Sequence, residues 1–280
     1  MSTLTASELE RLLFEDAPYG DLTTEALRIG EAMGSIRFTA RGPMVVAAID
    51  EAAALFALCG VAARPRVKAG DRVAAGAILL EGEGPTKGLM KAWKVAQTLM
   101  EIWSGVAGAA RALVASARAA RPDVVVACTR KNVPGTKALA IAAIKAGGAA
   151  PHRLGLSETI LVFPQHRVFR PNVAFSTLAT ELRGEAPEKK LVVEVGSVGE
   201  AIAAAEAGFD VVQTEKFDPQ EVEETARAFA ALSRRPVLAA AGGIHPENAA
   251  AYALAGADVL VTSWPYTARP TDVAVTMGAL

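Results

Sequence analysis

The chain has 280 residues, of which 51 % are hydrophobic and 21 % charged, and this composition excludes a largely disordered protein. Its 29 Lys and Arg residues balance 30 Asp and Glu residues, so the formal net charge of −1 argues against a nucleic-acid partner. Two cysteines, Cys59 and Cys128, indicate a reducing compartment, and we expect a cytoplasmic location. No uncharged apolar run is long enough to predict a membrane span.

The first third of the chain is expected to form a small domain of mixed helix and strand. Thr5 or Ser7 can cap a first helix. Residues 34–40 alternate apolar and polar side chains as a strand does, and residues 44–49 do so more weakly. Glycines at short intervals over 70–84 predict tight turns, which are typical of a small sheet or sandwich.

A long helix is predicted over 86–120, and Pro122 follows its end because proline disfavours helix at the residue before it. Lys94 lies on this helix, where a lone lysine is typical of a solvated face. Beyond Pro122, apolar strands alternate with alanine-rich helices. The predicted strands are 124–128, 159–162, 190–195, 210–214, 236–240 and 258–262, and the predicted helices are 138–146, 174–183, 199–207, 219–232 and 247–255.

Solid runs of Val, Ile and Leu are typical of parallel strands buried on both faces. Their regular alternation with helices favours a parallel α/β barrel over an open sheet. The active site of such a barrel lies at the C-terminal ends of its strands. We therefore expect one functional site from the polar residues at or beyond these ends: Arg130, Lys131, His152, Arg153, His166, Glu194, Glu215, Gly242, Gly243 and Ser263.

These residue types suit an anionic, phosphorylated small molecule held with a metal. The side chains that could bind its acid groups are Arg130, Lys131, Lys137, His152, Arg153 and His166. The Gly242-Gly243 pair allows backbone N–H groups to approach a phosphate at the start of the following helix, and Ser263 belongs to the same phosphate-binding group. Glu194 and Glu215 could hold Mg²⁺, which prefers oxygen ligands plus substrate phosphates.

Structural roles stay open for several of these residues. Glu194 could be a buried acid paired with an arginine, His152 a hydrogen-bonded structural histidine, and the glycine pair only a tight turn. His166 could be an ordinary loop residue. Cys128 ends a buried strand and is expected to be a small core residue.

Motifs along nearly the whole chain occur together in one order. They are EDAPYGDLTT (15–24), SGVAG (104–108), TRKNVPGTK (129–137), GGAAPHRLGLSE (147–158) and AAGGIHPENAAAYALAGAD (240–258). In this order the chain resembles the quinolinate phosphoribosyltransferase family, the nicotinate-nucleotide pyrophosphorylases of NAD synthesis. The combination of TRK-x-x-PG with GG-x-x-x-HR is the most specific part of the resemblance.

The resemblance implies an N-terminal α/β sandwich-like domain over 1–105, joined by 268–280, and an incomplete parallel α/β barrel of the TIM type over 106–267. It implies a homodimer with its active site at the subunit interface. The family joins a pyridine dicarboxylate to 5-phosphoribosyl 1-pyrophosphate with Mg²⁺ and no organic cofactor, and it releases pyrophosphate and CO₂.

The resemblance also assigns roles to single residues. Glu194, Glu215 and Lys131 correspond to catalytic positions, and the two glutamates to metal-binding ones. The substrate-binding positions are Arg130, Lys137, His152, Arg153, His166 and Lys94, of which Lys94 is contributed by the partner subunit. Gly242 and Gly243 correspond to the phosphate-binding turn, and Ser263, which follows the last predicted strand, is expected to join them.

The chain departs from the family at several of these motifs. Phe163 stands where the family has an active-site lysine, and Ala239 where it has a glutamate before the glycine pair. Asn132 and Lys137 replace a threonine and an arginine. A phenyl ring cannot bind a carboxylate, so we expect either a different acceptor or weakened catalysis. These departures resemble a subgroup of the family found with molybdate-transport genes.

We therefore expect an enzyme that transfers phosphoribosyl from 5-phosphoribosyl 1-pyrophosphate to a small nitrogen-heterocycle acid. A quinolinate phosphoribosyltransferase of NAD synthesis is one alternative. A protein that binds a phosphorylated metabolite or an oxyanion such as molybdate, without turnover, is another. A phosphosugar aldolase would need a Schiff-base lysine at a strand end, for which Lys131 is the candidate.

Overall fold

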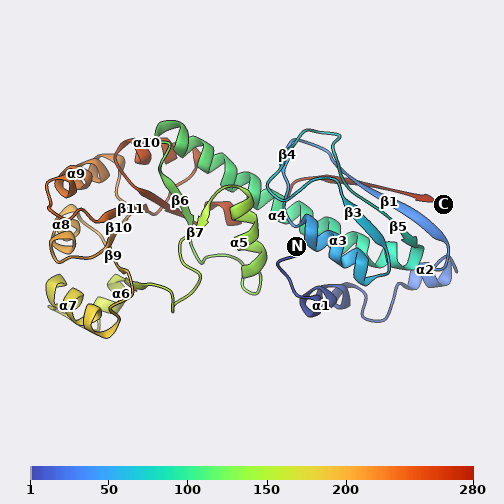
Figure 1. The fold of residues 1–280 in the computed structure, drawn as a ribbon, viewed down its shortest axis with the longest axis horizontal. Helices are drawn as coiled ribbons and strands as arrows, with labels where there is room; N and C mark the ends of the chain where they lie inside the picture. Colours follow the sequence, from blue (N-terminus) through green and yellow to red (C-terminus); the bar gives the residue numbers. More distant parts are fainter. Residues whose placement is uncertain (1) are drawn as a thin grey trace. The chain divides into compact units, whose positions relative to one another are not determined.

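A computed structural model describes residues 2–280, which divide into two compact units (Figure 1). The first unit contains the residues up to 111 together with 132–148 and 265–280, and the second contains 112–131 and 149–264. The predicted domain boundaries stay predictions. Among the described residues, no helix is long and apolar enough to cross a membrane.

The first unit is built on a four-stranded antiparallel sheet of order β13-β1-β5-β3. Its strands are β1 (Met33–Ala40), β3 (Ala62–Pro65), β5 (Ile78–Pro85) and β13 (Val273–Ala279), and a separate short pair joins β2 (Met44–Val45) to β4 (Arg72–Val73). Its helices are α1 (Ala6–Asp16), α2 (Leu22–Ala26), α3 (Ile49–Leu58), α5 (Lys137–Ala146) and the first part of α4 (Thr86–Ala120). The last strand of the chain thus pairs along β1.

Local sequence explains most of these elements. Thr5 caps α1 as predicted, because its side chain accepts from the Glu8 backbone N–H while the Glu8 carboxylate accepts from the Thr5 backbone N–H. In β1, the alternating pattern buries Phe38, whose ring packs edge-on against Phe56 of α3 at 5.8 Å between centroids.

The prediction of a strand over 44–49 is wrong beyond its first two residues. Only Met44–Val45 is a strand, and α3 begins at Ile49. The buried residues Ile49, Ala52 and Phe56 recur with helical rather than strand spacing, so burial of this face decides the structure. The turn between the two elements has Ala48 at a φ of +56°.

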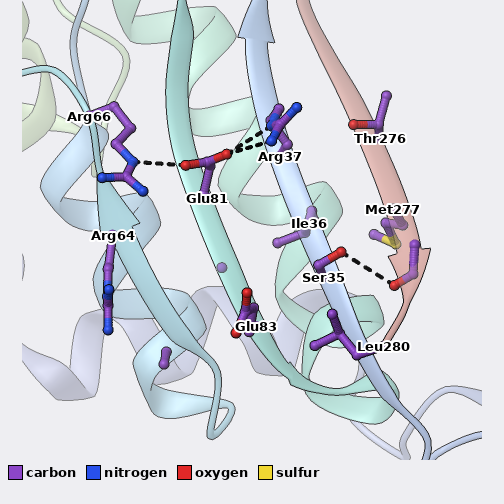
Figure 2. Close-up of a pocket in the computed structure, with 13 residues that line it drawn as sticks. Ser35, Ile36, Arg37, Arg64, Arg66, Glu81, Glu83, Thr276, Met277 and Leu280 are labelled. Atoms are coloured by element: carbon purple, nitrogen blue, oxygen red, sulfur yellow. Dashed lines mark hydrogen bonds and ion pairs between the residues drawn. The ribbon is translucent and has the colours of Figure 1, made fainter.

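The outward face of the four-stranded sheet carries a charged ladder across three adjacent strands (Figure 2). Glu81 of β5 accepts hydrogen bonds from Arg37 of β1 and from Arg66, the residue after the end of β3, each at 2.8 Å from Nε. The two guanidinium groups lower the pKa of the Glu81 carboxyl. These side chains line a hollow on this face together with Arg64, Glu83 and Met277.

The second unit is built on a seven-stranded parallel sheet of order β7-β6-β12-β11-β10-β9-β8. Its strands are β6 (Val125–Cys128), β7 (Ala150–Pro151), β8 (Ile160–Val162), β9 (Leu191–Val195), β10 (Val211–Glu215), β11 (Val237–Ala241) and β12 (Val259–Thr262). Its helical segments are the end of α4, α6 (Pro164–Arg167), α7 (Phe175–Glu185), α8 (Val198–Glu206), α9 (Pro219–Ala230) and α10 (Pro246–Leu254). The 3₁₀ turn η1 (Trp264–Thr267) lies where the chain returns to the first unit.

The sheet curls without closing, because β7 and β8 lie at its two edges. The predicted mixed α/β fold with an incomplete barrel is confirmed. One face of the sheet carries an apolar cluster of Ala239, Ala241 and Val261, against which Val211 and Val259 pack. Figure 1 shows α8, α9 and α10 along the other side of the central strands.

Candidate active site

Parallel pairing brings the predicted polar residues of the second unit to one edge of the sheet, which we call the C-terminal edge. Hydrogen bonds continue the pairing beyond two strand ends. The Thr129 N–H donates to the Thr262 carbonyl at 2.8 Å, and the His152 N–H donates to the Cys128 carbonyl at 2.8 Å. The loops that carry Arg130, Lys131 and His152 therefore start at this edge.

Glu194 of β9 is a half-buried acid at this edge, with one hydrogen-bond partner and a shifted pKa. Its Oε2 accepts a hydrogen bond from Gln213 Nε2 of β10 at 2.6 Å, so its partner is an amide and not the arginine that a structural role would predict. Burial raises the pKa of Glu194, and Glu215 raises it further, whereas the Gln213 hydrogen bond and the Lys131 charge oppose the shift. Glu194, Glu215 and Lys131, the three predicted catalytic residues, thus interact electrostatically.

The glycine pair after β11 makes a turn that only glycine fits. Gly242 and Gly243 have φ angles of +91° and +74°. A Cβ at position 242 would lie 2.7 Å from Lys216 Cγ, 2.9 Å from Lys216 N and 3.2 Å from Glu215 Oε1. The turn therefore lies directly against the acid at the end of β10. Ser263 is half-buried after β12, two strands from Glu215 in the sheet order.

A cationic group gathers around the loop after β7. Arg153 is only 6 % exposed, and its guanidinium lies 5.7 Å from the centre of the Phe163 ring. Burial lowers the pKa of Arg153, and the charge of Arg130 lowers it further. Burial also lowers the pKa of His152, with Arg153 and Arg130 adding to the shift. Among the described residues no ion pair involves Arg130, Lys131 or Arg153, although the charge of Glu158 opposes the pKa shifts of Arg153 and His152. Arg130 and Lys131 are exposed, so their charges are available to an anion.

Three predicted substrate-binding residues have other surroundings. His166 is exposed on α6, where its Nδ1 accepts a hydrogen bond from the Phe163 N–H at 2.9 Å and its ring stacks on Phe163. Lys94 lies in the first unit, where its Nζ donates to Gln97 Oε1 at 2.9 Å. Lys137 is the exposed first residue of α5 in the same unit. Their substrate-binding roles stay predictions.

Among the described residues, no group of three or more His, Cys, Asp or Glu side chains could by itself hold a metal ion. The interacting pair Glu194 and Glu215 still fits Mg²⁺, since this ion is commonly held by one or two carboxylates together with substrate phosphates. Cys128 is buried at the end of β6, and burial raises its pKa to about 12. It is a core residue, as predicted, and not a nucleophile.

The sequence interpretation missed Gln213 and the placement of Phe163. In the sequence, Gln213 is the single amide of the apolar run DVVQT. The interpretation of this run as a buried strand gives the amide no role. For Phe163, the sequence indicates only the loss of the positive charge that the family has at this position. In the structure its ring contacts both the Arg153 guanidinium and the His166 ring, so it contributes a surface to the cationic group.

Comparison with known proteins defines the class. Residues 106–276 match the family described as quinolinate phosphoribosyl transferase, C-terminal domain, and residues 21–104 match its N-terminal domain. The chain belongs to the quinolinate phosphoribosyltransferase family and is an enzyme of the pentosyltransferase class.

Within the family, the chain is similar to proteins named ModD. The predicted resemblance to a subgroup of the family is thereby confirmed. A relative from Rhodobacter capsulatus named "Putative pyrophosphorylase ModD" is 45 % identical over 252 residues, which cover 89 % of this chain and 96 % of that protein. A relative of the same name from Escherichia coli O6:H1 is 39 % identical over 278 residues, with 99 % and 98 % covered. A probable carboxylating nicotinate-nucleotide pyrophosphorylase from Archaeoglobus fulgidus is 30 % identical over 249 residues, with 88 % and 93 % covered.

Solved structures share the fold over the full length. NadC from Streptococcus pyogenes superposes with a TM-score of 0.91 at 24 % identity and covers 100 % of each chain. Nicotinate-nucleotide pyrophosphorylase from Ehrlichia chaffeensis gives a TM-score of 0.91 at 19 % identity, covering 99 % of this chain and 100 % of that one. The fold class of the sequence interpretation agrees with these structures.

Proposed function

We propose that the enzyme transfers the phosphoribosyl group of 5-phosphoribosyl 1-pyrophosphate to the nitrogen of a small heterocyclic acid. The observation that carries this proposal is the group at the C-terminal edge, where Glu194, Glu215 and Lys131 interact beside the Gly242-Gly243 turn. Neighbouring strands and loops also supply the unpaired cationic side chains that an acidic acceptor needs.

In the proposed reaction, the C1–O bond of the donor breaks and pyrophosphate leaves with the bonding electron pair. The lone pair of the acceptor nitrogen then forms the C1–N bond. Glu194 and Glu215 face the positive charge that develops at the ribose, and Arg153 and Arg130 bind the acid of the acceptor. His152, whose lowered pKa favours the neutral ring at neutral pH, offers a hydrogen bond without adding charge.

Glu194 and Glu215 would hold Mg²⁺ with the donor, and the ion would neutralise charge on the departing pyrophosphate. Lys131 and the backbone N–H groups of the glycine turn would bind the phosphate oxygens. Ser263 would add a hydroxyl to the same group. No organic cofactor is required by this reaction.

The same proposal includes a cytoplasmic homodimer in which Lys94 of one subunit reaches the site of the other. The support for this arrangement is the resemblance to the family, in which the matching position is contributed by the partner subunit. A role linked to molybdate transport rests on the resemblance to the subgroup alone.

The test is release of pyrophosphate from 5-phosphoribosyl 1-pyrophosphate, with and without Mg²⁺, in the presence of a panel of heterocyclic acids that includes quinolinate. We expect Mg²⁺-dependent release with at least one acceptor. A preference for quinolinate would assign the enzyme to NAD synthesis. Folded protein that releases none with any acceptor, yet binds phosphate or molybdate by calorimetry, would contradict transfer and favour the binding-protein alternative.

A further inference from the structure

Gln213 is a buried amide with only one end satisfied. The residue is 4 % exposed on β10, and its Nε2 donates to Glu194 Oε2 at 2.6 Å. Its Oε1 is fully covered and has no hydrogen-bond donor, the one such side-chain atom among the described residues. A buried carbonyl oxygen without a donor destabilises a protein, so such an atom calls for an explanation.

The chemistry of Glu194 determines which way this amide points. An ionised carboxylate only accepts hydrogen bonds, so the NH₂ end of Gln213 faces Glu194 and the carbonyl end faces away from it. The missing donor therefore has to approach Oε1 from a side that Glu194 does not occupy.

The neighbouring strands offer no donor at that position. In the sheet register, Gln213 lies between Glu194 of β9 and Ala239 of β11, and Ala239 presents only a methyl group. Glu215 follows on the same face of β10 and carries acceptor oxygens when ionised. Val211 precedes Gln213 on that face and packs into the apolar cluster with Ala239 and Ala241. A donor would therefore have to come from the C-terminal edge, where the proposed substrate binds, and would have to displace the atoms that cover Oε1 in this structure.

We propose that Gln213 is a specificity-determining residue that recognises a ribose hydroxyl, with Oε1 accepting from the O–H while Nε2 holds Glu194 in place. This inference rests on the proposed function, because the ligand is the sugar phosphate of the ribosyl donor. Gln213 and Glu215 lie on the same face of β10, and Gln213 Oε1 and the Glu215 carboxylate are both acceptors, which suits the two O–H donors of a vicinal diol. Ionised phosphate and carboxylate groups have no proton to donate to it.

The experiment measures binding rather than turnover, so that it does not depend on finding the acceptor. Calorimetry compares ribose 5-phosphate with its 2-deoxy and 3-deoxy analogues, each with and without Mg²⁺. For the wild-type chain, removal of the recognised hydroxyl should weaken binding roughly 5- to 20-fold, as expected for one hydrogen bond to a buried acceptor. In Gln213→Met, which keeps the side-chain length but loses the amide, ribose 5-phosphate and the analogue that lacks the recognised hydroxyl should bind with similar affinity.

Two further variants separate recognition from folding. Gln213→Asn shortens the same amide by one methylene group and should reduce the discrimination even if the methionine variant is unstable. Thr214→Val is the matched control, because Thr214 is equally buried in the same strand but points to the opposite face. It should keep the wild-type discrimination.

The inference would be overturned if wild-type protein failed to bind ribose 5-phosphate, bound all three sugars equally, or kept its discrimination in Gln213→Met. It would also be overturned if wild-type protein bound Mn²⁺ without sugar and Gln213→Met did not, since Oε1 would then be a cation ligand. Failure of the proposed transfer gives a different pattern, in which hydroxyl discrimination persists while no acceptor releases pyrophosphate.

Discussion

Glu194 is placed where its charge is costly for folding and useful for the proposed chemistry. Burial raises its pKa above the value in the unfolded chain, so the folded state loses stability as the pH rises from the unfolded pKa through the folded pKa. An acid in this condition is typical of functional sites.

Glu194→Gln removes that charge and keeps an acceptor for Gln213. At pH 7 we expect a higher midpoint of urea unfolding and a kcat lower by about 100-fold, the scale seen when a charge-stabilising group is lost from an active site. The gain in stability should disappear as the pH falls below the pKa of an unperturbed glutamate, about 4.3, because the wild-type carboxyl is then protonated in both states. Glu181→Gln, an exposed acid on α7, is the control. Unfolding with unchanged specific activity would mean that Glu194 is structural.

Arg153 is the residue expected to hold the acid of the acceptor. Arg153→Ala should raise the KM for the acceptor by roughly 10- to 100-fold, since a hydrogen bond to a charged group contributes about 1.5–3 kcal/mol. The KM for the ribosyl donor should change much less. Arg170→Ala removes a guanidinium that pairs with Glu181 on the surface and should leave both constants unchanged. An equal effect on both substrates in Arg153→Ala would argue for a general structural role.

At the scale of elements, the strand-to-helix turns decide which side chains reach the site. The turn after β11 depends on Gly242, whose positive φ and close approach to Lys216 leave no room for a Cβ. Lys216 itself has a φ of +60°, so two strained turns meet where Glu215 ends β10.

Gly242→Ala should therefore destabilise the chain by about 1–3 kcal/mol and weaken phosphate binding, because the turn must shift. Gly199→Ala is the matched control: Gly199 is exposed within α8 with open space around its Cα, and the change should stabilise by about 0.5–1 kcal/mol. Urea unfolding and calorimetry with inorganic phosphate measure both effects. Equal stability of the two variants would show that the turn tolerates a side chain.

At the scale of the whole molecule, the proposed dimer can be tested by mixing two inactive variants. Lys94→Ala and Glu194→Gln each remove one part of the proposed shared site. If Lys94 acts across the interface, random reassortment should restore roughly a quarter of the wild-type activity, because half the dimers contain one intact site of two. Activity that stays at the level of the separate variants, with subunit exchange verified by native mass spectrometry, would contradict a shared site.

Sequence patterns alone determined much of this protein. Apolar runs and alanine-rich helices predicted the parallel strands from 124–128 to 258–262, and the polar residues beyond their ends predicted the C-terminal edge. Local periodicity suffices there, because a strand buried on both faces has few alternatives. The predicted strand over 44–49 failed where helical burial of α3 prevailed over weak alternation.

Only the tertiary structure decided which side chains meet. Gln213 and Glu194 are 19 residues apart, and their hydrogen bond depends on the register of β9 against β10, which no local pattern specifies. The pairing of β13 with β1 brings the last strand of the chain beside residues 33–40. The contact of Arg153 with Phe163 depends on how the loops after β7 and β8 fold at the C-terminal edge. Packing and register between distant segments, rather than residue type, determine these contacts.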